Sequence, residues 1–110
     1  VAYDTYFTQS TDGGASFGNP VKLSTASSDP DGSSTNGLSA QFIGDYISAV
    51  SDSRGRRIFA VWTDSRNSTP CPAVDVFRAS EPGTVPPPNV ANDCPVTFGN
   101  TDIYFGTIDY

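Results

Sequence analysis

The stretch STDGGASF, Ser10 to Phe17, joins two segments that are rich in β-forming residues. Residues 1–10 carry β-branched and aromatic side chains throughout, and residues 16–24 are typical of a returning strand. The Asp-Gly-Gly sequence at residues 12–14 suits a tight turn, because glycine adopts positive φ without strain. The sequence therefore predicts an outer β-hairpin over residues 1–24.

The other residues of this stretch also suit the turn. Asp12 can accept hydrogen bonds from backbone N–H groups across it, and Ser10 and Ser16 are placed to satisfy further turn groups. Phe17 is expected to fold its ring back against the hairpin. Pro20 has no N–H to donate, so it confines the second strand to a sheet edge or a bulge.

A second, inner hairpin is predicted over residues 41–67. The runs YISAVS (46–51) and RIFAVWT (57–63) are strand-like, and DSRGRR forms the turn between them. The continuous apolar run from Phe59 to Trp62 indicates a strand that is buried on both faces. Residues 102–110 are predicted to form a closing strand.

Residues 68–101 form an insertion that holds most of the nine prolines, so it cannot be regular sheet. Within it, VDVFRAS (74–80) suits either a short strand or a helical turn. Cys71 and Cys94 flank the Pro-rich stretch. In an oxidising compartment they are expected to form a disulfide, worth roughly 3 kcal/mol in the chain-entropy model. The alternative is a pair of free thiols.

Composition favours an all-β segment, because Gly, Pro, Ser, Thr, Asn and Asp fill much of the 110-residue chain. The net charge is −6, and no basic stripe offers the phosphate contacts that nucleic acid needs. No apolar run approaches the ~20 residues of a membrane span. An acidic, Lys-poor surface suits a secreted or cell-surface protein. The chain has no Met, so we expect it to be one piece of a longer polypeptide.

Two segments share the pattern Asp-x-Tyr-Phe, one beginning at Asp4 and the other at Asp102. With the insertion subtracted, their separation falls to about the length of one four-stranded propeller blade. The pattern therefore indicates an internal repeat, with two strands of one blade and three strands of the next.

Five residues match the pattern Ser-x-Asp-x-Gly-x-Ser/Thr-aromatic, namely Ser10, Asp12, Gly14, Ser16 and Phe17. This motif resembles the Asp-box of BNR-repeat, sialidase-like β-propellers. The later runs FIGDYISAV, IFAVWTDSRN and DIYFGTID are similar to the strands that follow in those proteins. The resemblance implies an all-β, partial β-propeller of about 1.5–2 four-stranded antiparallel blades, with a Pro-rich, disulfide-closed insertion. The box itself is expected to be structural.

The resemblance also implies a catalytic set to look for: three Arg for a substrate carboxylate, a Tyr nucleophile with a Glu partner, and an Asp acid/base. The only Glu is Glu81, inside the insertion, so no complete set fits in this chain. Arg66 is the single catalytic candidate. Its favoured interpretation is an ion pair with Asp64 that ties down a loop. Trp62 is expected to be a core residue.

Two further groups are considered as ligand sites. Arg54, Arg56 and Arg57 lie in a predicted hairpin turn and are interpreted as a solvated face. Asp29 and Asp31 alternate ahead of a glycine, a pattern that can hold Ca²⁺. An EF-hand would need further acids that this stretch lacks, so a plain turn is favoured. Calcium is the only candidate cofactor.

Two functions are consistent with these observations. The first is a segment of a secreted sialidase-like β-propeller, non-catalytic on its own, with an extracellular glycan-binding, surface or structural role. The alternative is the C-terminal part of an exo-sialidase-type glycoside hydrolase whose catalytic residues lie mostly outside the segment. In both cases the expected partners are the remaining blades, from the same parent chain or a cleaved chain, and glycans are the candidate ligands.

Overall fold

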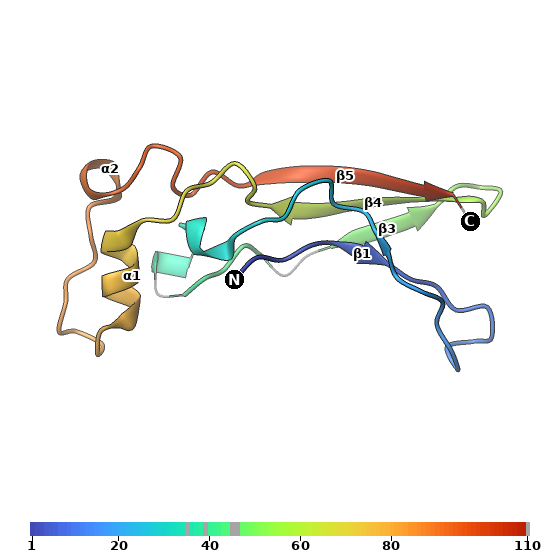
Figure 1. Cartoon of the computed structure of the whole chain (residues 1–110), viewed down its shortest axis with the longest axis horizontal. Coiled ribbons are helices and arrows are strands. Elements are labelled where there is room, and N and C mark those ends of the chain that lie inside the picture. Colours follow the sequence, from blue (N-terminus) through green and yellow to red (C-terminus); the bar gives the residue numbers. More distant parts are fainter. Residues whose placement is uncertain (35, 39, 45–46, 110) are drawn as a thin grey trace.

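The computed structural model describes residues 1–34, 36–38, 40–44 and 47–109. The fold is mostly β, with two antiparallel sheets, two short α-helices and two 3₁₀ turns (Figure 1). The expectation of an all-β chain is therefore corrected in one region, because both α-helices lie in the insertion at residues 68–101. The prolines of this region disfavour regular sheet, but they do not exclude helices that begin at a proline.

The first hairpin is a two-stranded sheet. Strand β1 (Tyr6–Phe7) pairs antiparallel with β2 (Val21–Lys22), and an isolated bridge joins Tyr3 to Ser28. The tip of the hairpin extends away from the rest of the molecule, at the lower right of Figure 1. The ring of Phe17 is 65% exposed in this tip. The expectation that Phe17 folds back against the hairpin is wrong, because the two strands pair too briefly to offer it a surface.

The second sheet has three strands in the order β3-β4-β5. They are β3 (Ser48–Ser51), β4 (Arg57–Asp64) and β5 (Asp102–Asp109). All eight residues of β4 pair with β5, so segments that are 38 to 52 positions apart in the sequence become part of one sheet. Asp45 and Tyr46 of the predicted inner hairpin, and Tyr110 of the closing strand, lie outside the described residues.

The two faces of this sheet differ. One face carries Ala60, Trp62 and Asp64, all at most 5% exposed, and the first hairpin lies against it through Tyr3 and Leu23. The other face is open. The expectation that Phe59 to Trp62 is buried on both faces is therefore wrong. Alternation along β4 sends only every second side chain toward the hairpin.

The helical end of the molecule holds its hydrophobic cluster. Helix α1 (Pro72–Ala79) begins with a proline, which suits the first helical turn, and α2 (Val90–Asp93) follows. Two 3₁₀ turns, η1 (Pro30–Gly32) and η2 (Asn36–Leu38), lie beside them. The buried cluster comprises Leu38, Cys71, Val74 and Phe98. The VDVFRAS run is thus helical, and the insertion supplies a core rather than only a loop.

The predicted disulfide is confirmed. Cys71 and Cys94 are bonded, with their Cα atoms 5.1 Å apart, and Cys71 is fully buried. The bond joins the start of α1 to the end of α2, so it fixes the two helices of the insertion to each other. A disulfide is compatible with an extracellular location.

Candidate functional site

The polar centre of the molecule is Asp64, the last residue of β4, which is 2% exposed. Its carboxylate accepts five hydrogen bonds. The side-chain donors besides Arg66 are the Ser28 hydroxyl at 2.7 Å and the Trp62 indole at 3.2 Å. Arg66 donates from its backbone N–H and, through Nε and Nη2, from its guanidinium at 2.8–2.9 Å. A buried carboxylate is tolerated when its oxygens are paired in this way.

Arg66, the single catalytic candidate, is occupied by the protein itself. The Nε/Nη2 edge of its guanidinium holds Asp64, and Nη1 donates to the Thr25 hydroxyl at 2.7 Å. Its Cζ lies 3.9 Å from the ring centroid of Tyr104, so one face of the guanidinium is stacked. The Nε/Nη2 edge, which could bind a substrate carboxylate through two hydrogen bonds, is occupied by Asp64. The geometry therefore indicates a structural role for Arg66, which joins the end of β4 to β5 and to the 25–28 segment.

The electrostatics of this pair follow from the same contacts. Burial alone would raise the pKa of Asp64, but hydrogen bonds from Arg66, Ser28 and Trp62 outweigh it and hold that pKa well below its ordinary value of 3.8. The hydrogen bonds that the Arg66 guanidinium donates to Asp64 in turn raise the pKa of Arg66. Both groups stay charged across the physiological range. Neither is poised to transfer a proton near neutral pH.

The Asp-box residues form a closed network in the β1–β2 turn. Ser10 donates to Asp12 at 2.7 Å and accepts from the backbone N–H of Gly14 at 2.8 Å. Ser16 donates to Asp12 from both its hydroxyl, at 2.6 Å, and its backbone N–H, at 2.9 Å. Gly14 has φ of 93°, in the left-handed region that favours glycine. These bonds, with that from Ser16 the strongest influence, hold the pKa of Asp12 far below its ordinary value.

Asp29 and Asp31 stabilise the local turn at η1. The Asp29 carboxylate accepts from the backbone N–H of Asp31 at 3.0 Å and so caps η1, and the Asp31 carboxylate accepts from Gln41. Among the described residues, no group of three or more His, Cys, Asp and Glu side chains is close enough to hold a metal ion.

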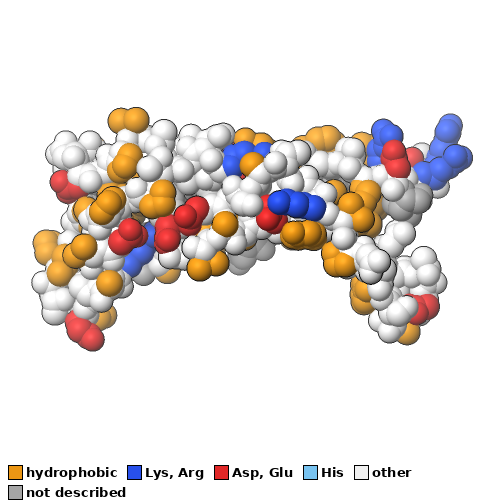
Figure 2. Space-filling model, in the orientation of Figure 1, with side chains coloured by type: hydrophobic (Ala, Val, Ile, Leu, Met, Phe, Trp, Pro, Cys, Tyr) orange, Lys and Arg blue, Asp and Glu red, His pale blue; other side chains and the backbone are white. Residues whose placement is uncertain are grey.

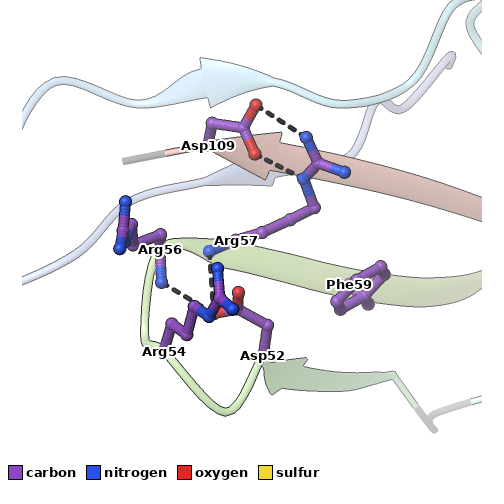
Figure 3. A pocket seen from close by; sticks show the side chains of 6 residues that line it. All are labelled: Asp52, Arg54, Arg56, Arg57, Phe59 and Asp109. Carbon is purple, nitrogen blue, oxygen red and sulfur yellow. Dashed lines mark hydrogen bonds and ion pairs between the residues drawn. The ribbon is translucent and has the colours of Figure 1, made fainter.

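The three turn arginines border a shallow hollow of about 410 Å³, together with Phe59 and the two aspartates Asp52 and Asp109 (Figure 3). Figure 2 shows Lys and Arg side chains gathered at this end of the molecule. Arg57 is the first residue of β4 and is paired with Asp109 on β5, with Nη2 3.0 Å from Oδ2. The Asp52 carboxylate accepts hydrogen bonds from the backbone N–H groups of Arg56 and Arg57. Of these three arginines, Arg54 and Arg56 have no side-chain partner among the described residues.

Glu81 lies after α1, where it borders a second hollow of about 250 Å³. The lining of that hollow contains no tyrosine; it comprises Phe77, Arg78, Ser80, Glu81, Pro82 and Gly83. Among the described residues, Glu81 is therefore not arranged with a tyrosine nucleophile.

Sequence reasoning missed two contributors to these sites. Arg78 of α1 donates to the backbone carbonyls of Asp31, Ser33, Leu38 and Ala40, and so fixes the 31–40 loop to the helix. Carbonyl acceptors carry no residue-type signal, so this role could not be found from sequence. Tyr104 stacks on Arg66, and this contact depends on the β4–β5 register, which the types of the two residues do not reveal.

No family model matches the chain, and no curated protein or solved structure is significantly similar to it. Within the part of the chain that the structure describes, no helix is long and apolar enough to cross a membrane.

Proposed function

We propose that this chain is a segment of an extracellular, sialidase-like β-propeller, non-catalytic on its own, with a structural or glycan-binding role. Support comes from the Asp-box residues, which form the hydrogen-bonded turn that their pattern predicts, and from the antiparallel sheet that follows. A three-stranded antiparallel sheet is the size of an incomplete four-stranded blade.

The observation that carries the proposal is the open face of the β3-β4-β5 sheet. The register places the apolar side chains of this face next to one another across the strands; they are Val50, Phe59, Val61, Ile103 and Phe105. Ile103 is 72% exposed and Phe105 is 59% exposed, and the rings of Phe59 and Phe105 stack with their centroids 6.1 Å apart. We call these five residues the open apolar face. A contiguous exposed patch of this kind marks an interaction surface.

The dimensions of the molecule support the same conclusion. Its accessible surface is 7078 Å², whereas a compact protein of this mass exposes about 5,800 Å². Its radius of gyration is 17.7 Å, against about 13 Å for a compact domain of this length. The excess surface exceeds the ~800 Å² that one partner buries in a standard interface. We infer that another β-sheet, supplied by the remaining blades, covers the open apolar face.

A scaffold role fits this chain better than catalysis. Arg66 pairs with Asp64 rather than facing an open site, and no tyrosine is among the described residues that line the hollow at Glu81. In a parent glycoside hydrolase, the residues that perform the reaction would therefore lie in other blades.

The test is the behaviour of the purified chain in analytical ultracentrifugation and thermal unfolding. We expect concentration-dependent association and a broad transition, because the open apolar face lacks its partner. The substitution Phe105→Asp should abolish the association. Val96→Asp is the matched control, since Val96 is fully exposed outside the sheet, and it should change nothing.

A monomeric chain with a sharp, cooperative transition would contradict the proposal. A fluorogenic sialoside tests its non-catalytic part, and we expect no turnover by the chain alone. Measurable hydrolysis that is lost in Arg66→Ala would assign a catalytic role to the segment instead.

A further inference from the structure

The outer edge of β5 is open. Strand β5 pairs with β4 along all eight residues, and no backbone hydrogen bond among the described residues reaches its other edge. The edge is long, because β5 runs from Asp102 to Asp109. Unpaired N–H and C=O groups along such an edge are a template for another strand.

The internal repeat indicates which strand would fit. Asp4-x-Tyr6-Phe7 in and before β1 corresponds to Asp102-x-Tyr104-Phe105 in β5. Strand β1 already has a partner of this kind, since Tyr6 lies opposite Lys22 and Phe7 lies opposite Val21 of β2. The same relation would place a valine opposite Phe105 and a lysine opposite Tyr104.

The contacts of β2 define the chemistry of that partner. The Lys22 ammonium lies 2.9 Å from the Asp4 carboxylate, and the Ser24 hydroxyl donates to the same group at 2.9 Å. Asp102 takes the place of Asp4 in the repeat and is exposed, and among the described residues Asn67 is its one side-chain donor. Pro20 suits a final strand, because a proline can face the side of a strand that no neighbour pairs with.

We propose that the outer edge of β5 binds an extended, antiparallel segment with the chemistry of Phe17–Ser24, in which a lysine pairs with Asp102 and a valine extends the open apolar face beside Phe105. The inference deepens the proposed function and rests on it, because it supplies the missing outer strand of the second blade. It requires only the repeat and the open edge, so it can be tested separately from packing on the sheet face.

The other open edge fits this partner less well. The four described residues of strand β3, Ser48–Ser51, include no carboxylate, whereas β5 begins with Asp102. Strand β3 is also half the length of β5. Charge and length therefore both favour β5.

The first experiment adds a fluorescent peptide, FGNPVKLS, to the purified 110-residue chain. Binding should protect the β5 amides from hydrogen exchange and leave those of β3 unchanged. A peptide with Lys22→Glu should bind about threefold more weakly or worse, because it repels Asp102. Asp102→Lys in the chain should restore binding of that peptide, whereas Asp75→Lys, on the exposed side of α1, should not. Equal binding of both peptides, or protection on β3 alone, would overturn the inference.

The second experiment does not depend on the chain folding alone. A copy of Phe17–Ser24 is attached after Tyr110 through a Gly-Ser linker, and thermal unfolding is compared with that of a chain carrying the scrambled sequence. We expect a higher midpoint for the native copy, or the appearance of a transition where the scrambled version has none. Equal behaviour of the two would overturn the inference. Because Phe105→Asp tests the face and Asp102→Lys tests the edge, failure of one proposal is distinguishable from failure of the other.

Discussion

Asp64 shows how one residue can join segments that are distant in sequence. It is the last residue of β4. Its carboxylate accepts hydrogen bonds from Ser28, which lies 36 positions earlier, and from the nearby Trp62 and Arg66. Arg66 then reaches Thr25 and Tyr104. Each of these donors would lose its acceptor if the carboxylate were removed, and a buried unpaired donor is costly. Asp64 therefore joins the 25–28 segment, which follows the first hairpin, to β4 and β5.

We predict that Asp64→Asn lowers the free energy of unfolding by about 3 kcal/mol near neutral pH, because it leaves Arg66 without its counter-charge. The pKa of Asp64 in the folded chain lies below 3.8, so its stabilisation is complete above that value and is lost as the pH falls below it. Denaturant titrations at several pH values should show that the difference in the free energy of unfolding between wild type and variant becomes smaller in acid. The exposed Asp75→Asn is the control. A difference that stays constant with pH would contradict the assignment.

At the residue scale, sequence reasoning worked where partners are neighbours. Asp64 and Arg66 are two positions apart at a strand end, and their pairing was the favoured interpretation of Arg66. Distant partners gave no comparable signal. Nothing in the types of Thr25 or Ser28 indicates that they lie near the Asp64–Arg66 pair, because a hydroxyl can equally well form its hydrogen bonds with water.

In strand β5, Gly106 lies opposite Ala60 of β4 and against the Trp62 ring. A Cβ at position 106 would lie 2.9 Å from Cη2 of Trp62. We predict that Gly106→Ala destabilises the chain by about 1–3 kcal/mol, because the Trp62 indole cannot move away without losing its hydrogen bond to Asp64. Gly18→Ala is the control; its Cβ would meet only the Gln9 carbonyl, at 3.7 Å. Unfolding monitored by Trp62 fluorescence measures both, and equal effects would contradict the prediction.

Helix α1 holds the 31–40 loop through Arg78. Its guanidinium donates to Ser33 at 2.8 Å, and to three further carbonyls at 3.0–3.2 Å. We predict that Arg78→Lys costs about 1.5–3 kcal/mol, because an ammonium cannot span four acceptors in a fixed plane. Amide exchange at Phe42, whose N–H donates to the Ser33 hydroxyl, should become faster. Arg54→Lys, on the open turn, should leave exchange unchanged, and a similar response in both variants would contradict the role.

At the element scale, the predictions succeeded where one physical signal dominated. The apolar run of β4 and the β-forming residues of β5 were enough to predict both strands. The VDVFRAS run remained open, because valine and phenylalanine favour strands while Pro72 ahead of them suits a helix start. The structure forms the helix, which buries Val74 beside Cys71. The open face of β4 could not be foreseen, because a strand's own residues do not reveal what covers them.

The whole molecule divides its stabilising interactions between two ends. The disulfide and the small apolar cluster lie at the helical end, whereas the sheet end relies on Trp62, Asp64 and the first hairpin (Figure 1). Between them the chain extends 54 Å along its longest axis but only 19 Å along its shortest. A molecule this thin has one buried sheet face at most. Its extended shape and its open apolar face are therefore two aspects of the same architecture.

We predict that this extended shape persists in solution. Small-angle X-ray scattering of the Phe105→Asp variant, in which association is blocked, should give a radius of gyration near 17.7 Å. The reason is that the Asp12 network joins residues of the hairpin tip only to one another, and no hydrogen bond among the described residues joins the tip to the three-stranded sheet. The wild-type chain at the lowest measurable concentration is the control. A value near the ~13 Å of a compact domain would mean that the chain covers its own open apolar face, and that face would then not be available to a neighbouring blade.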